Sequence, residues 1–233
     1  MLDHDHVSEP LVQPDTVELK RIYSQRFDEH IAYRNEVWKV LVSEFFARYI
    51  RPDATVLDLG CGYGQFVNNV VCQRKYAMDL NERAKEYLNS DVVFLEQDCS
   101  APWAVPAGSL DVVFTSNFFE HLLSKQALNA TLAQALHSLK RGGLLVAMGP
   151  NIKFVGGAYW DFCDHHLALT EASLSEALRV QGFAIQETIA RFLPYTMTNR
   201  RPIPTALVRL YLKLSLAWRV FGAQFLVVGQ KTN

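Results

Sequence analysis

The stretch VLDLGCGYG at residues 56–64 decides the fold of this chain. Its first half is a short apolar run, typical of a buried parallel strand, and its second half has glycine at every other position. Glycine lets the backbone turn sharply and lets a ligand approach without a Cβ in the way. The stretch therefore predicts a strand, a tight turn and a ligand that lies against the turn.

The spacing of the glycines narrows the class of ligand. A phosphate-binding loop needs a Gly-Lys-Ser/Thr ending, which this stretch lacks. In the dinucleotide fingerprint G-x-G-x-x-G, the third glycine comes one residue later than Gly64 does here. Asp58, two residues before the first glycine, would repel a pyrophosphate but suits a ligand that carries an ammonium group.

Helical and strand patterns alternate on both sides of this turn. The apolar spacing between Trp38 and Tyr49 fits one helix face, and Pro52 ends that helix. After the turn we expect helices at 65–73, 82–89, 125–140 and 171–181, the third stopped by the glycines at 142–143. Strands are expected at 55–59, 76–79, 92–95, 110–115, 144–148, 183–189 and 224–228. This alternation predicts an α/β fold, a doubly wound, Rossmann-like, seven-stranded and mostly parallel sheet with helices on both faces.

Composition and charge set the wider frame. The chain has 233 residues, 49% of them hydrophobic, which suffices for one large core. We expect residues 1–51 to form an N-terminal tail and helical cap, and residues 52–233 to form the Rossmann-like domain with a helical insertion at about 191–223. The four cysteines have no paired spacing, and neither a signal peptide nor a membrane span is visible, so we expect a cytoplasmic protein.

In the order of its motifs the chain resembles the class I S-adenosylmethionine-dependent methyltransferases, of small-molecule type. Their first motif is an acidic residue followed by x-G-x-G-x-G, which residues 58–64 match. The resemblance continues with Asp79, with Asp98-Cys99 and with NFFEH at 117–121, each after a predicted strand. LKRGG at 139–143 and DHHLALT at 164–170 also look like family motifs, so the match covers roughly residues 54–190.

The resemblance implies S-adenosylmethionine as cofactor, with S-adenosylhomocysteine as its product. Asp58 would organise the turn, Asp79 would accept hydrogen bonds from both ribose hydroxyls, and Asp98 would bind the adenine amino group. The residues implied in cofactor binding are Asp58, Gly60, Cys61, Gly62, Tyr63, Gly64, Asp79, Leu80, Asp98, Cys99, Asn117 and Phe118.

The sequence says less about the residues that would bind and activate the methyl acceptor. A base is needed only if the acceptor loses a proton. His121 is the first catalytic candidate, followed by His165 and His166, although each also suits a packing or capping role. Residues 151–161 resemble a lid whose aromatic residues equally suit a core. We find no metal-ligand spacing and expect no metal.

We therefore expect methyl transfer to a small-molecule acceptor, such as a sugar, a glycan precursor, or a lipid-linked or natural-product intermediate. An NAD-linked oxidoreductase and a non-catalytic cofactor-binding or scaffold protein stay open as alternatives. No nucleic-acid partner is expected, because NFFE at 117–120 lacks the two prolines of an Asn-Pro-Pro-Tyr-like motif.

The C-terminal segment is basic. After Glu187 the chain has no acidic residue, whereas seven lysines and arginines follow it. The segment 203–221 could lie on a membrane surface, contact a phosphate-bearing acceptor, or pack against the domain or a second subunit in a homodimer. We favour packing.

Overall fold

The structure, a computed structural model, describes residues 31–195 and 202–232. Seven strands form one sheet in the order β3-β2-β1-β4-β5-β7-β6. All neighbouring strands are parallel except β7, which runs antiparallel to β5 and β6. The predicted seven-stranded, mostly parallel sheet is confirmed. The strands are β1 Thr55–Leu59, β2 Arg74–Asp79, β3 Val92–Glu96, β4 Leu110–Ser116, β5 Leu139–Pro150, β6 Phe183–Ile189 and β7 Gln224–Lys231.

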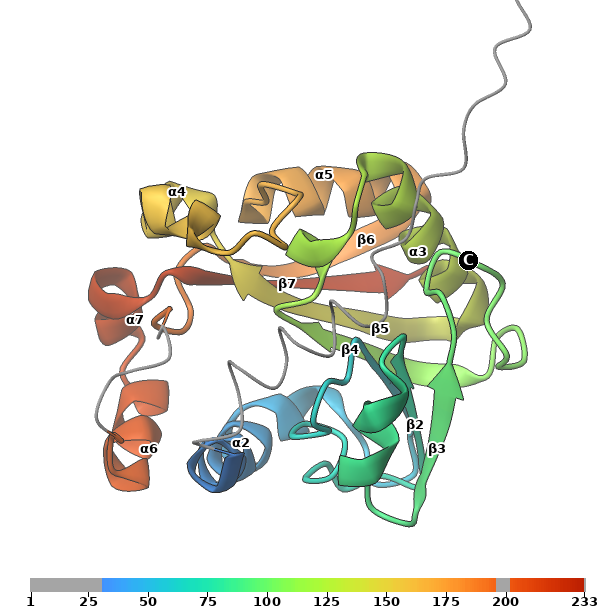
Figure 1. Cartoon of the computed structure of the whole chain (residues 1–233), viewed down its shortest axis with the longest axis horizontal. Helices are drawn as coiled ribbons and strands as arrows, with labels where there is room; N and C mark the ends of the chain where they lie inside the picture. The colour runs from blue at the N-terminus through green and yellow to red at the C-terminus, as the bar shows by residue number, and fades with distance from the viewer. Residues whose placement is uncertain (1–30, 196–201, 233) are drawn as a thin grey trace, which may run out of the picture.

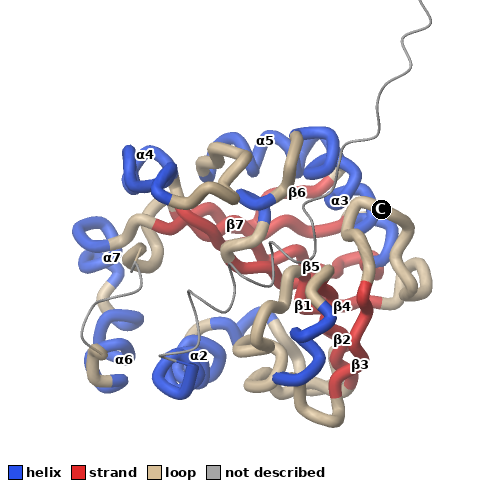
Figure 2. Tube along the Cα trace, in the orientation of Figure 1, coloured by secondary structure: helices blue, strands red, loops and turns tan. Residues whose placement is uncertain are grey.

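Helices cover both faces of the sheet (Figures 1 and 2). α3 and α5 lie over one face, and α2 lies over the other with α6 beside it. The α-helices are α2 Ile31–Glu44, α3 Lys125–Ser138, α4 Ile152–Val155, α5 Glu171–Gln181, α6 Thr205–Lys213 and α7 Ser215–Phe221. The 3-10 helices are η2 Phe46–Tyr49, η3 Glu82–Tyr87, η4 Phe119–His121 and η5 Gly156–Asp161. No helix in these described ranges is long and apolar enough to cross a bilayer.

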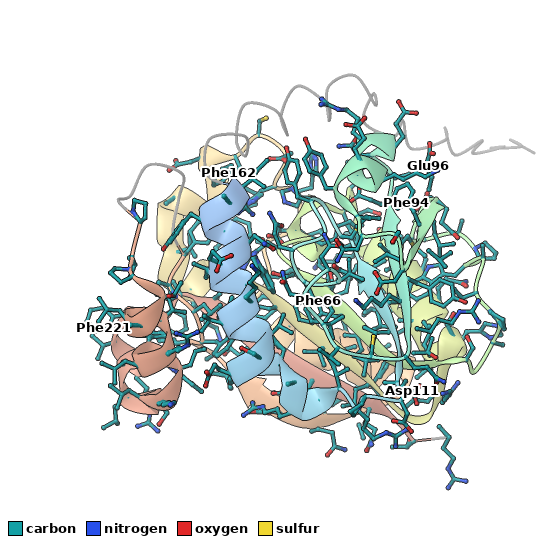
Figure 3. The ribbon with its side chains drawn as sticks, turned by 90° about the horizontal axis from the view of Figure 1, so that it is seen from below. Phe66, Phe94, Glu96, Asp111, Phe162 and Phe221 are labelled. Atoms are coloured by element: carbon teal, nitrogen blue, oxygen red, sulfur yellow. The ribbon has the colours of Figure 1, made fainter. Side chains whose placement is uncertain are left out.

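Each face of the sheet has its own apolar core. On the α3 and α5 side, residues such as Leu132 and Leu178 pack on Leu57 and Leu145 of the sheet. On the α2 side the core is aromatic, and the rings of Phe66 and Phe114 stack with centroids 3.6 Å apart. Phe66 lies inside the molecule, as Figure 3 shows. The central strands β1, β4 and β5 are mostly buried on both faces, which fixes their register.

The capping residues identified in the sequence begin the predicted helices. The side chain of Asn81 accepts a hydrogen bond from the N–H of Arg83, and that of Ser124 from Ala127. Thr170 forms a capping box with Ser173, and the helix it begins ends at Gly182, whose φ is +103°. The helix predicted at 82–89 is a 3-10 helix, η3, which ends at Tyr87.

Two local predictions are wrong. Residues 65–73 form turns and not a helix. The side chains of Asn68 and Asn69 there bond to the backbone oxygens of Tyr87 and Gln65, an arrangement that competes with a helix. The predicted stop at 142–143 is also misplaced, because α3 ends at Ser138 and both glycines lie within β5.

The insertion between β6 and β7 forms two helices, α6 and α7, with a break at Leu214. Leu212 is buried, and Val208, Tyr211 and Trp218 pack on the core beside α2. The expected packing against the domain is thus confirmed for this side of the insertion. The other side is exposed, and residues 196–201 of the insertion, which include Arg200 and Arg201, lie outside the described residues.

Candidate functional site

The glycine turn joins β1 to the loop that follows it. The N–H groups of Gly60 and Cys61 both donate to the carbonyl oxygen of Met78 on β2, at 2.9 and 3.1 Å. Gly60, Gly62 and Gly64 have φ values of +69°, +50° and +66°, which only glycine adopts without strain. The turn is therefore held at the carboxyl edge of the sheet, where ligands bind in open α/β folds.

Phe118 lies against the turn. A Cβ on Gly60 would lie 2.3 Å from the ring of Phe118, so only glycine leaves room for it. Its neighbour Asn117 has φ +49°, the one positive φ of a non-glycine residue in residues 31–195 and 202–232. A backbone conformation of this kind is costly and is concentrated at functional sites. The loop after β4 is thereby brought onto the glycine turn.

Two carboxylates, Asp58 on β1 and Asp79 at the end of β2, flank the glycine turn. Asp58 is buried, and one of its oxygens accepts a hydrogen bond from the N–H of Val67 at 3.3 Å. Burial raises its pKa to about 8, and the neighbouring Asp79 adds to the rise. The two oxygens of Asp79 accept from the N–H groups of Gly62 and Asn81, both at 2.9 Å. Burial also raises the pKa of Asp79, against the lowering effect of these hydrogen bonds.

The remaining predicted cofactor residues follow the ends of neighbouring strands. Leu80, after β2, is 37% exposed and offers an apolar surface beside Asp79. Asp98, after β3, accepts hydrogen bonds from the N–H and the hydroxyl of Ser100, both at 2.8 Å. The sulfur of Cys99 lies 3.2 Å from the hydroxyl of Thr131 on α3, within the core. Cys61 is buried as well, and the ring of Tyr63 packs edge-on against Tyr87.

This arrangement fits S-adenosylmethionine. Two carboxylates in one buried region favour a cationic ligand, because each raises the cost of ionising the other. Gln65, directly after the turn, is 9% exposed, and its Nε2 has no hydrogen-bond partner among the described residues. Such a donor suits the carboxylate of an amino-acid ligand. The glycine turn would thus hold the methionine part of the cofactor, Asp79 the ribose and Asp98 the adenine.

A carboxylate–histidine cluster, made of Glu120, His121, Asp164 and His165, lies next to this region. The Nδ1 of His121 donates to the backbone oxygen of Asp164 at 2.9 Å and lies 3.2 Å from its carboxylate. The two acids raise the pKa of His121, which burial alone would lower. Glu120 is 2% exposed, and burial raises its pKa to about 7.

The segment after η5 carries the second histidine into the cluster. His165 is buried, and its ring centroid lies 5.0 Å from that of His121. Its Nδ1 donates to the backbone oxygen of Tyr159 at 2.7 Å. The N–H groups of His166 and Leu167 donate to the backbone oxygen of Glu120, at 2.8 and 3.1 Å. These bonds fix the segment, whereas the side chain of His166 is exposed and lies outside the cluster.

Comparison with known families now identifies the chain. A family model described as "Methyltransferase domain" matches residues 29–188. The chain belongs to this methyltransferase family. A comparison with curated proteins finds no match. The sheet order and the glycine turn agree with the class I S-adenosylmethionine-dependent superfamily that the sequence resembles.

Solved structures show the same fold in other methyltransferases. The chain is similar to one from the complex of the Haloferax volcanii Trm112 methyltransferase activator with a methyltransferase, with 17% identity, coverage of 96% and 100% of the two chains and a TM-score of 0.65. It is also similar to a SAM-dependent methyltransferase from Archaeoglobus fulgidus, with 17% identity, 88% and 100% coverage and a TM-score of 0.63. A third is the geranyl diphosphate C-methyltransferase from Streptomyces coelicolor, in complex with Mg²⁺, geranyl diphosphate and S-adenosyl-L-homocysteine, with 13% identity, 81% and 77% coverage and a TM-score of 0.55.

Sequence reasoning missed two members of the methyltransferase's cluster, Glu120 and Asp164. Both stand beside a candidate histidine, so an acid next to a histidine was the available signal. The contact of Asp164 with His121 was not predictable, because 43 residues separate the two and the contact depends on how the segment around η5 folds. In that segment Tyr159 is buried in the core and Trp160 is 52% exposed, which fits the core alternative for Tyr159.

Proposed function

We propose that the protein transfers a methyl group from S-adenosylmethionine to a small-molecule acceptor. The observation that carries this proposal is the pair of buried carboxylates, Asp58 and Asp79, around a glycine turn at the carboxyl edge of the sheet. An NAD-linked oxidoreductase would need a pyrophosphate at this turn, which the two acids disfavour. The four cysteines of this protein are free thiols, and this supports the cytoplasm as the compartment in which it works.

The residues of the chain contribute mainly by placement. When bound, S-adenosylmethionine supplies a methyl group on a sulfonium, ready for in-line attack. Asp79 and Asp98 hold the two ends of the nucleoside, and Asn117 and Phe118 limit where the sulfonium lies. Alignment of two reactants in this way is worth several kcal/mol of barrier.

The acceptor meets the cluster of Glu120, His121, Asp164 and His165. Two observations support this. Phe118, on the same loop as His121, packs on the glycine turn. The charge of His121 is also close enough to Asp79 to lower the pKa of that acid. Because Asp164 orients the ring of His121 through Nδ1, the other ring nitrogen is the one available to the acceptor's reacting group.

A transfer assay tests the proposed activity. The protein is incubated with cofactor labelled in the methyl group and with separate small-molecule and lipid extracts. We expect label in a new product with the native protein, and more than about tenfold less with Asp79→Asn. Cofactor binding without labelled product in any extract would favour the non-catalytic alternative instead.

A lipid-linked acceptor is supported by the exposed side of α6 and α7. Figure 3 shows Phe221 at the outer edge of these helices, away from the sheet. Lys213 and Arg219 form no ion pair within the described ranges, whereas Arg209 lies 3.6 Å from Glu44. Large apolar side chains that are 43% to 73% exposed surround them: Ile203, Leu207, Leu210, Leu214, Leu216, Val220 and Phe221.

This surface fits an anionic lipid membrane, since apolar side chains and unpaired cations together are what such an interface binds. β6 runs parallel to β5, so the insertion leaves the sheet at the same edge as the cofactor site. A protein docked through α6 and α7 would therefore hold its acceptor site near lipid.

Vesicle binding tests the docking. We expect the native protein to bind vesicles of phosphatidylcholine with phosphatidylserine, and to release them at high salt. Replacing Leu216, Val220 and Phe221 by serine should weaken binding more than about tenfold. Serine at Val71 and Val180, which lie elsewhere on the surface and are at least as exposed, is the control and should change little. Unchanged vesicle binding by the triple variant would contradict the membrane assignment. A native protein that is a dimer in solution, with a triple variant that is a monomer, would contradict it as well.

A further inference from the structure

The carboxylate–histidine cluster contains the ligand set of a metal ion. Glu120, His121 and His165 each offer one ligand atom, and the three atoms lie within 4.8 Å of one another. In a tetrahedral site with metal–ligand distances of about 2.0–2.2 Å, two ligand atoms lie about 3.3–3.6 Å apart. The three side chains would therefore have to close by up to about 1.5 Å to complete the site.

A hydrogen bond to a backbone carbonyl orients each histidine ring. A carbonyl oxygen can only accept, so Nδ1 of His121 donates to Asp164 and Nδ1 of His165 donates to Tyr159. Ligating histidines almost always donate their other ring N–H to a carboxylate or a carbonyl in this way, which fixes the orientation of the ring.

Glu120 supplies the electrostatic reason for a cation. Its side chain is 2% exposed, and no lysine or arginine within residues 31–195 and 202–232 forms an ion pair with it. His121, when protonated, is its cationic neighbour. Burying a carboxylate is costly, and a bound metal ion would reduce that cost.

We propose that Glu120, His121 and His165 bind a divalent transition-metal ion beside the cofactor site. Two imidazoles and one carboxylate suit Zn²⁺, Fe²⁺ or Mn²⁺, whereas Mg²⁺ and Ca²⁺ prefer oxygen ligands. Three protein ligands leave open positions, as in catalytic sites. This replaces the expectation that no metal binds, which rested on sequence spacing and could not register ligands 44 residues apart.

The site gives the proposed methyltransferase a way to activate its acceptor, and in this respect it rests on the proposed function. An acceptor hydroxyl at an open position would lose its proton to solvent more easily, because a divalent ion lowers the pKa of a bound oxygen. His121 then acts as a ligand and not as a general base.

Calorimetry with Zn²⁺ alone tests the site without cofactor or acceptor, so its outcome does not depend on methyl transfer. All proteins carry Cys163→Ser, because that exposed thiol next to Asp164 could bind zinc by itself. We expect one Zn²⁺ per chain, and affinity lower by more than about 100-fold in Glu120→Gln, His121→Gln and His165→Gln. Asp164→Asn, which only orients a ligand, should cost about 10- to 100-fold.

His166→Gln is the matched control, since His166 is next to His165 but exposed and outside the cluster. Its zinc affinity should stay within about twofold of the parent. Bound Co²⁺ should give a visible absorption band, and His121→Gln should alter this band. His121 is chosen because its side chain is 30% exposed, so the fold tolerates its replacement better than that of the two buried ligands. Absence of stoichiometric Zn²⁺ binding, or equal affinity in the folded His121→Gln and His166→Gln proteins, would overturn the proposal.

Discussion

Replacing Asp79 by asparagine removes one charge from the cofactor site and keeps the volume of the side chain. The native oxygens accept from Gly62 and Asn81 at 2.9 Å, so the carboxylate holds the glycine turn. In the proposed site the same carboxylate would also accept hydrogen bonds from the ribose. A hydrogen bond to a charged group is worth about 1.5–3 kcal/mol, which corresponds to about 10- to 150-fold in affinity. We expect a loss of this size for S-adenosylhomocysteine, measured by calorimetry.

Asp53→Asn makes the same chemical change at an exposed position before β1, far from the carboxyl edge of the sheet. Its affinity should stay within about twofold of the native value, as expected for a distant site. A thermal melt of each variant shows that the protein is folded at the temperature of the titration. If folded Asp79→Asn binds as tightly as Asp53→Asn, the ribose is held elsewhere and the assignment of the end of β2 fails.

Two further predictions concern Gly60 in the glycine turn and Asp58 on the strand that precedes it. Gly60→Ala should lower the free energy of unfolding in urea more than Gly108→Ala does. Both glycines have positive φ, which costs an alanine about 1–2 kcal/mol. Only at Gly60 does the new Cβ also meet the ring of Phe118. Equal losses would show that the Phe118 contact is unimportant. For Asp58, a pKa of about 8 in the fold against 3.8 unfolded means that the folded protein keeps a proton between these values. The free energy of unfolding should therefore fall as pH rises from about 4 to 8, by at most about 1.4 kcal/mol per unit, and Asp58→Asn should flatten this slope. The same slope in both proteins would contradict the assignment.

The parts of the fold that were predictable are those that local chemistry determines. The residues Asn81, Ser124, Thr170 and Gly182 begin or end elements because their side chains or φ values satisfy helix termini. The strand that ends at Asp79 was identified because both of its faces are buried and apolar.

Other features depend on distant parts of the chain. The helix expected at 65–73 gives way to turns because Asn68 bonds to Tyr87 and Asn89, about twenty residues away. The cluster requires Asp164 and His165 to return to the loop after β4, through backbone bonds to Glu120. No spacing rule reports such a return, so the candidate histidines were found and their acidic partners were not.

The most direct test of the central claim is calorimetric titration of the native protein with S-adenosylhomocysteine. One site per chain with a micromolar dissociation constant is the predicted result, because the glycine turn, Asp79 and Asp98 follow the carboxyl ends of neighbouring strands. Folded protein that gives no heat beyond dilution, with this ligand and with S-adenosylmethionine, would contradict the account of this chain as a methyltransferase.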